Sequence, residues 1–126
     1  MLPGIRVFGE DYPDQADMFV RLTGLAQGTR NYQAHVKVCK RGSGALRTML
    51  TKATSKMNGL PVVTLELGDR DEANFELVLR YLYTEELAFV DSEHCRGVML
   101  IADRLNMAQL RYTCVEFMSS HRGSRV

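Results

Sequence analysis

The sequence predicts an α+β domain in which a small three-stranded sheet is capped by a cluster of about five helices. Three observations lead to this class. Two short segments with the composition of strands stand early in the chain, one apolar strand-like segment follows the first helices, and the last third is helical. Because strands and helices are segregated in this way, we expect a layer of helices over one small sheet.

The sheet is expected to begin with a hairpin. Residues 18–22 and 30–34 have the length of strands, and Gly24 and Gly28 lie in the connection between them. Residues 62–67 are the third strand, an apolar run that follows a break in the chain at Asn-Gly-Leu-Pro. Two apolar residues are adjacent in the first strand, so alternation alone does not say which of its faces is buried.

The helices are indicated by apolar residues at i, i+3, i+4 and i+7 and by residues that start or stop a helix. Ser43 is expected to cap the second helix, and Asn106 to separate the fourth from the fifth. In the third helix Glu76 and Arg80 have the spacing of an ion pair. The five helices are expected at about residues 35–40, 44–53, 75–82, 91–105 and 110–117.

A chain of 126 residues is expected to form one domain. We divide it into an N-terminal arm at 1–16, the domain at 17–119 and a flexible tail at 120–126. Apolar residues are 45% and charged residues 25%, a balance typical of globular proteins, and no apolar run reaches the roughly 18 residues of a membrane helix. The N-terminus does not resemble a signal peptide, and three cysteines without CxxC spacing favour reduced thiols. A cytoplasmic or nuclear location is therefore expected.

Positive charge is concentrated in one part of the chain. Between Met18 and Leu65 there is no Asp or Glu. We interpret this segment as a basic face for an acidic partner, or for the acidic half of the domain itself. Nucleic acid is a less favoured partner, because Tyr32 is the sole aromatic residue that interleaves with the basic ones. The basic residues are Arg21, Arg30, Lys37, Lys40, Arg41, Arg47, Lys52 and Lys56.

Reactive side chains do not form an enzyme-like pattern. His35 opens a helix and is interpreted as a structural histidine whose ring satisfies a backbone group. The alternative is a thiol enzyme in which His35 and Cys39 act as a pair on one helix face. His94 and Cys95 are adjacent, so they diverge by about 100 degrees on a helix and chelate a metal poorly. Cys114 is expected to be a buried thiol. We expect no catalytic residue, no cofactor and no metal.

Six short motifs stand in order between Asp17 and Phe117. They are an acidic residue before a strand, an alanine-histidine step into a helix, a serine-led helix, a buried strand, a long helix ending in Tyr-Thr, and a closing pair of helices. Together they resemble the BTB/POZ domain, a protein-interaction fold. The matching residues are Asp17 to Leu22, Ala34-His35 with Val38, Ser43 with Leu46, Met49 and Leu50, Val63 to Leu65, Phe75 to Thr84, and Ala102-Asp103 with Leu105, Leu110, Cys114 and Phe117.

The resemblance implies a non-catalytic domain that binds other proteins. The leading expectation is an adaptor that links a substrate-recruiting protein to a cullin ubiquitin-ligase scaffold. The alternative is a homo- or hetero-association module of a transcriptional, cytoskeletal or trafficking protein. Members that bind cullins often carry an apolar residue, any residue and then Glu after the serine-led helix, whereas this chain has Met-Asn-Gly at 57–59. By the resemblance, the partner-binding residues are Met49, Met57, Asn58, Tyr83, Glu85, Glu86 and His94.

Many members of the family also dimerise through an N-terminal helix. Prolines and glycines recur in residues 1–16, so this helix is not expected here. Val36 stands where the family often has Lys or Arg, which leaves Asp17 to pair with Arg21 or Lys37. The oligomeric state is left open between a monomer and a dimer with a smaller interface. The residues of that dimer interface would be Ile5, Val7, Phe8 and Val36.

Overall fold

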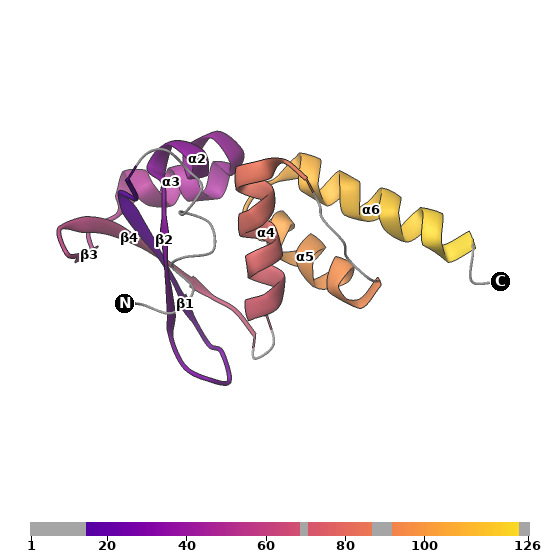
Figure 1. Cartoon of the computed structure of the whole chain (residues 1–126), viewed down its shortest axis with the longest axis horizontal. Helices are drawn as coiled ribbons and strands as arrows, with labels where there is room; N and C mark the ends of the chain where they lie inside the picture. The colour runs from indigo at the N-terminus through magenta and orange to yellow at the C-terminus, as the bar shows by residue number, and fades with distance from the viewer. Residues whose placement is uncertain (1–14, 69–70, 87–91, 124–126) are drawn as a thin grey trace.

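The computed structural model describes residues 15–68, 71–86 and 92–123 of the chain. Two strands come first, and helices dominate the second half, as Figure 1 shows. The elements in chain order are β1 (Met18–Thr23), β2 (Arg30–Ala34), α2 (Val36–Gly42), α3 (Gly44–Lys52), β3 (Lys56–Met57), β4 (Leu60–Glu66), α4 (Glu72–Thr84), α5 (Ser92–Arg104) and α6 (Ala108–Gly123). The sheet lies on one side of the molecule, α4 stands in the middle, and α5 and α6 lie on the other side.

The sheet has the strand order β2-β1-β4-β3. Its central strand β1 pairs antiparallel with β2 and parallel with β4, so that Phe19 lies opposite both Gln33 and Val62. Parallel neighbours need a long crossover connection, and here α2 and α3 lie within it. The α+β class is confirmed, and the described residues contain the expected five helices. Within the same residues the sheet has four strands rather than the expected three, because β3 adds a short one at the edge.

The additional strand β3 belongs to a tight hairpin. Met57 pairs with Leu60, and the two residues between them, Asn58 and Gly59, have φ angles of 53° and 80°. Positive φ at both central residues is the geometry of a type I′ turn, which Asn-Gly favours because these residues tolerate the left-handed region. The Asn-Gly pair therefore forms a hairpin turn here, whereas the sequence led us to expect an irregular break.

The expected cap of α3 is confirmed, and the same side chain also joins two distant segments. Ser43 Oγ accepts from the backbone N–H of Leu46 at 3.0 Å and donates to the carbonyl of Leu105 at 2.6 Å. Ser43 is buried, so both bonds are shielded from water. Asn106, with a φ of 55°, lies between α5 and α6 as expected. Hence the start of α3 is held against the connection between the last two helices.

The ion pair expected between Glu76 and Arg80 is not formed. Glu76 instead accepts a hydrogen bond from the Tyr32 hydroxyl at 2.8 Å, and Glu72 Oε2 lies 3.2 Å from the same hydroxyl. Tyr32 is fully buried, and a buried hydroxyl needs an acceptor. Burial and the two carboxylates raise the pKa of Tyr32. The contact between strand and helix therefore outweighs the exposed pair within the helix.

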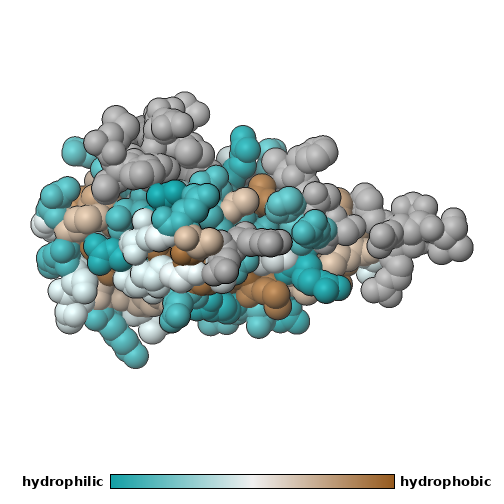
Figure 2. Space-filling model, turned by 90° about the horizontal axis from the view of Figure 1, so that it is seen from below, coloured by the Kyte–Doolittle hydropathy of each residue, from teal (hydrophilic) through white to brown (hydrophobic). Residues whose placement is uncertain are grey.

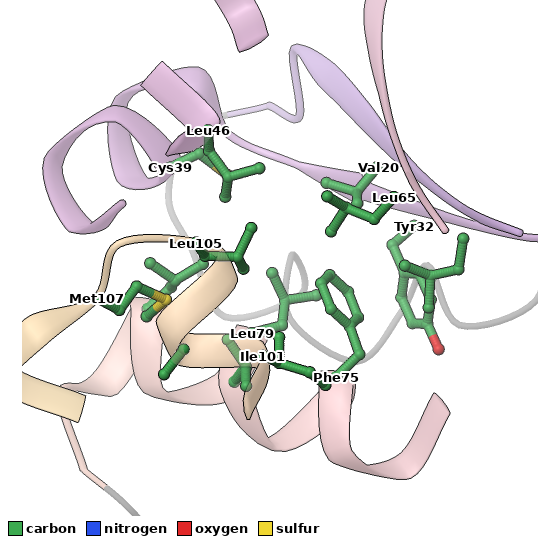
Figure 3. Packing of buried hydrophobic residues seen from close by; sticks show 14 of the residues in the cluster. Val20, Tyr32, Cys39, Leu46, Leu65, Phe75, Leu79, Ile101, Leu105 and Met107 are labelled. Atoms are coloured by element: carbon green, nitrogen blue, oxygen red, sulfur yellow. The ribbon is translucent and has the colours of Figure 1, made fainter. Parts of the chain in front are cut away.

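The core lies between the inner face of the sheet and the helices. Val20 and Leu65 point from the sheet toward Phe75 and Leu79 of α4, while residues of α2, α3 and α5 close the other sides, as Figure 3 shows. Both adjacent residues of the first strand are buried: Val20 belongs to this cluster, whereas Phe19, 1% exposed, faces the opposite side of the sheet. This explains why alternation did not identify the inner face.

The outer surface is largely hydrophilic on the side seen from below Figure 1. Figure 2 shows that hydrophobic residues on this face form small separate groups among hydrophilic ones. No helix in the described part of the chain combines the length and apolar character needed to cross a membrane. The last helix, α6, continues to Gly123, beyond residue 119, where we had placed the domain boundary. The division into arm, domain and tail stays a prediction.

Candidate partner-binding surface

Three of the expected contact residues lie on or near the hairpin, and we call Met49, Met57 and Asn58 the hairpin surface. Asn58 is exposed at the turn, and Met57 is half-buried, with its sulfur accepting a hydrogen bond from Arg21 Nη2 at 3.8 Å. Met49 is a half-buried residue of α3 that packs against the core, and α3 lies against β4. Because the turn is closed by strand pairing, it presents Asn58 on a well-defined backbone.

Gly59 occupies the position where cullin-binding relatives often carry Glu. A side chain there would meet no atom within 4 Å, so space does not exclude it. The φ of 80° does oppose it, because residues with a Cβ adopt the left-handed region at a cost of roughly 1–2 kcal/mol. The backbone conformation of the hairpin therefore disfavours a Glu at position 59.

Three further expected residues lie at the end of α4, and we call Tyr83, Glu85 and Glu86 the α4-end surface. Glu85 has a left-handed φ of 60°, and its N–H donates to the Tyr81 carbonyl at 2.7 Å, which ends the helix. The N–H of Glu86 donates to Thr84 Oγ1 at 3.1 Å. Both carboxylates are exposed, while their backbone is held in place.

Tyr83 is half-buried and carries a structural contact. Its hydroxyl and His35 Nδ1 lie 2.6 Å apart in a hydrogen bond, and the two rings meet edge to face with centroids 5.6 Å apart. His35 is 2% exposed, as expected of a structural histidine. The contact that orients its ring comes from a side chain 48 residues further along the chain, in addition to any backbone partner. Tyr83 therefore offers a partner its ring more readily than its hydroxyl.

The seven expected contact residues do not form one compact patch. His94 is exposed on α5, and Figure 1 places the beginning of α5 at the side of the molecule opposite the β3–β4 hairpin. A hollow of about 550 Å³ lies beside the hairpin, lined among others by Phe19, Gln33 and Asn58. Sequence reasoning missed this hollow because its residues come from separate strands that meet only in the folded sheet.

The expected dimer residues are described in part. Ile5, Val7 and Phe8 lie outside the described residues. Val36 is half-buried at the first turn of α2, and its N–H donates to Asp17 Oδ1 at 2.7 Å. Asp17 thus accepts a hydrogen bond from an N–H at the start of α2 that has no partner within the helix. This is a capping contact made by a residue from before β1. The expected ion pair of Asp17 with Arg21 or Lys37 is not formed.

The cysteine thiols are buried in the core. Cys39 is inaccessible to solvent, and its burial, with the nearby Asp17 carboxylate, raises the pKa of its thiol to about 12. A thiolate nucleophile is therefore strongly disfavoured at Cys39, against the alternative of a His35–Cys39 enzyme pair. Cys114 is buried as expected, and Cys95 is buried whereas its neighbour His94 is exposed. Within the described residues no group of three or more His, Cys, Asp and Glu side chains is placed to hold a metal ion.

The structure combines a small sheet, a helical layer and exposed turns. The sequence model of the BTB/POZ domain matches residues 15–122. The chain therefore belongs to the BTB/POZ domain family, whose members mediate association between proteins and dimerisation.

Solved structures show the same fold. The BTB domain of zebrafish PATZ1 superposes with a TM-score of 0.65 at 17% sequence identity, over 89% of this chain and 82% of that one. The BTB (Tramtrack and Bric a brac) domain of human gigaxonin gives a TM-score of 0.62 at 20% identity, over 81% and 76% of the two chains. No curated protein sequence matches the chain significantly. At these identities the likeness establishes the fold alone.

Proposed function

We propose that this domain is a non-catalytic adaptor that joins a substrate-recruiting protein to a cullin ubiquitin-ligase scaffold. The observation that supports the proposal is the β3–β4 hairpin, whose turn presents Met57 and Asn58, two of the residues that the family resemblance suggests as partner contacts. A turn fixed by strand pairing loses little conformational freedom on binding. The same turn also replaces the usual Glu with Gly59, so binding would depend on the remaining contacts.

Calorimetric titration with the N-terminal domains of a panel of cullins tests this function. We expect a dissociation constant of about 1 µM or tighter with at least one of them, equivalent to about 8 kcal/mol of binding free energy. Met57→Ala should weaken that binding, because Met57 is one of the proposed contact residues and part of its side chain is exposed beside the turn. Tyr112→Ala, on the exposed part of α6, is the control with unchanged affinity. Absence of heat with every cullin would refute the adaptor role.

The α4-end surface has its own test. The double variant Glu85→Lys with Glu86→Lys should weaken cullin binding without lowering the unfolding midpoint, because both side chains are exposed and their structural bonds involve the backbone. Glu116→Lys, exposed on α6, introduces the same type of charge elsewhere. If affinity is the same in all three proteins, this surface does not contact the cullin.

The second candidate function is a homo- or hetero-association module without a ubiquitin role. The left-handed backbone at Gly59 favours it, because that backbone disfavours the Glu of cullin-binding relatives. Sedimentation equilibrium over a range of concentrations separates the candidates. A concentration-dependent dimer together with no cullin binding would support the association module, and a monomer that binds a cullin would exclude it.

A further inference from the structure

The basic residues in the first half of the domain fall into two groups. Those on β1 and β2 have partners within the domain: Arg30 Nε lies 3.1 Å from Glu72 Oε2, and Arg21 Nε donates to Asn31 Oδ1 at 3.1 Å. The others are exposed, and none of them forms an ion pair with an acidic side chain of the described residues. We call the five on α2 and α3 the basic surface: Lys37, Lys40, Arg41, Arg47 and Lys52.

Four of these residues form a continuous surface across the two helices, whereas Lys52, at the end of α3, lies about 140 degrees around that helix from Arg47. Lys37, Lys40 and Arg41 are spaced i, i+3 and i+4, which places them on the outer face of α2, opposite the buried Cys39. Arg47 of α3 donates through Nε and Nη2 to the Lys40 carbonyl at 3.1 and 2.8 Å. This bidentate contact joins the outer faces of the two helices, which lie side by side in Figure 1.

Like charges at this density repel one another, and the described part of the domain does not neutralise them. The whole chain has a net charge of only +1, so the basic surface is a local asymmetry and not a property of the whole molecule. We propose that the basic surface binds an acidic segment of a partner protein. Its residues differ from those of the hairpin and α4-end surfaces, although Arg41 adjoins the end of α4. Its existence does not depend on cullin binding.

A short acidic protein segment fits this surface better than other polyanions. α2 has seven residues and is about 10 Å long, which limits the surface to a few side-chain contacts. Acidic groups lie at both ends: Asp17 at the start of α2, and Glu85 beyond the end of α4, where Arg41 Nη2 approaches the Leu82 carbonyl at 3.5 Å. These carboxylates would repel a phosphate backbone that continued past the surface.

The composition of the surface argues in the same direction. Single-stranded nucleic acids are bound by basic residues together with exposed aromatic rings on which bases stack. Tyr32, the aromatic residue between Arg21 and Lys56, is fully buried. Insertion into a membrane would need exposed apolar side chains among the cations, whereas Leu100, Tyr112 and Val115 lie on α5 and α6.

The test is fluorescence anisotropy of a labelled oligo-glutamate peptide with the full chain at about 0.05 and 0.15 M salt. The double variant Lys40→Glu with Arg41→Glu should weaken binding by roughly tenfold or more, because two attractive contacts become repulsive. It keeps the backbone carbonyl that Arg47 uses. Arg80→Glu with Arg96→Glu is the matched control, since it makes the same change in net charge at exposed positions of α4 and α5 and should alter affinity by less than about twofold.

Several results would overturn the proposal. Equal losses in the two double variants would mean that net charge alone drives binding, and no binding of the wild-type chain at the lower salt would remove the site. Circular dichroism checks folding, and Lys37→Gln with Lys52→Gln provides a milder variant that should lose roughly threefold. Short duplex DNA and phosphatidylserine vesicles are titrated in parallel. Tighter binding of either than of the peptide, lost in the Lys40→Glu/Arg41→Glu variant, would assign the surface to that ligand instead.

Discussion

At the scale of single residues, the contact between His35 and Tyr83 distinguishes what a sequence reveals from what only the fold reveals. The position of His35 at a helix start among apolar residues was enough to predict a structural role, and its burial agrees. Its 2.6 Å partner Tyr83 is 48 residues distant, beyond the reach of any local pattern. A side chain interpreted as a partner contact thus also has a structural function within the domain.

Tyr83→Phe is expected to lower the free energy of unfolding by about 1–2 kcal/mol, because it removes the Tyr83 hydroxyl from a partly buried hydrogen bond to His35. Urea denaturation followed by circular dichroism measures the change. Tyr112→Phe removes a hydroxyl from a side chain that is 55% exposed and should change stability by less than about 0.5 kcal/mol. Equal effects of the two substitutions would show that the His35 contact adds no stability.

At the scale of elements, long periodic segments were predictable and the shortest one was not. The apolar stripe of α4 predicts a helix, and four of its residues are buried against the core. The helix begins at Glu72, three residues before the expected start at Phe75. The sequence did not indicate this earlier start, because the apolar stripe begins only at Phe75. β3 has two residues, too few for a periodic signal, and the strand pairing seen in the structure depends on the Asn58-Gly59 turn.

Gly59→Glu is expected to destabilise the domain by about 1–2 kcal/mol although the space around Gly59 is open, because the new residue must adopt a φ of 80°. Ser55→Glu places the same charge at an exposed position just before β3, where φ is not positive, and should be nearly neutral. Thermal unfolding of both variants measures the difference. If Gly59→Glu is as stable as Ser55→Glu, the turn conformation does not account for the glycine.

At the scale of the whole molecule, the buried thiols make stability depend on pH. The pKa of Cys39 is about 9 in the unfolded chain and about 12 in the folded one. The folded state therefore holds the Cys39 proton more tightly than the unfolded state. The contribution of this proton to the free energy of unfolding is complete below pH 9 and is lost as pH rises from about 9 to 12. At a pH of about 10.5 the loss is about 2 kcal/mol.

We expect Cys39→Val to lose less stability than the wild-type chain between pH of about 8 and 10.5, as measured by urea denaturation at each pH. Comparing slopes cancels the constant effect of the substitution on packing, and the tyrosines and lysines titrate alike in both proteins. Identical slopes would mean that Cys39 ionises without opposition from its surroundings. The wild-type thiol should also resist alkylation until the domain unfolds, since Cys39 is inaccessible to solvent.

The candidate contact surface was predictable as a set of residues but not as an arrangement. The family resemblance supplied the seven positions, whereas their distribution over the hairpin, the end of α4 and α5 follows from packing among elements that are distant in the sequence. The basic surface shows the reverse case. Its charges were visible in the sequence, but only the structure separates Arg30, which pairs with Glu72, from the cations on α2 and α3.

The parallel pairing of β1 with β4 sets the order in which the chain can acquire structure during synthesis. Phe19 pairs with Val62 and Thr23 with Glu66, so the central ladder of the sheet joins segments separated by more than a third of the chain. Until Glu66 has left the ribosome, β1 and β2 can form only a two-stranded hairpin, which is marginally stable in water. A nascent chain therefore exposes the apolar face of β1 throughout that interval, and it is in this period that we expect a chaperone to bind it.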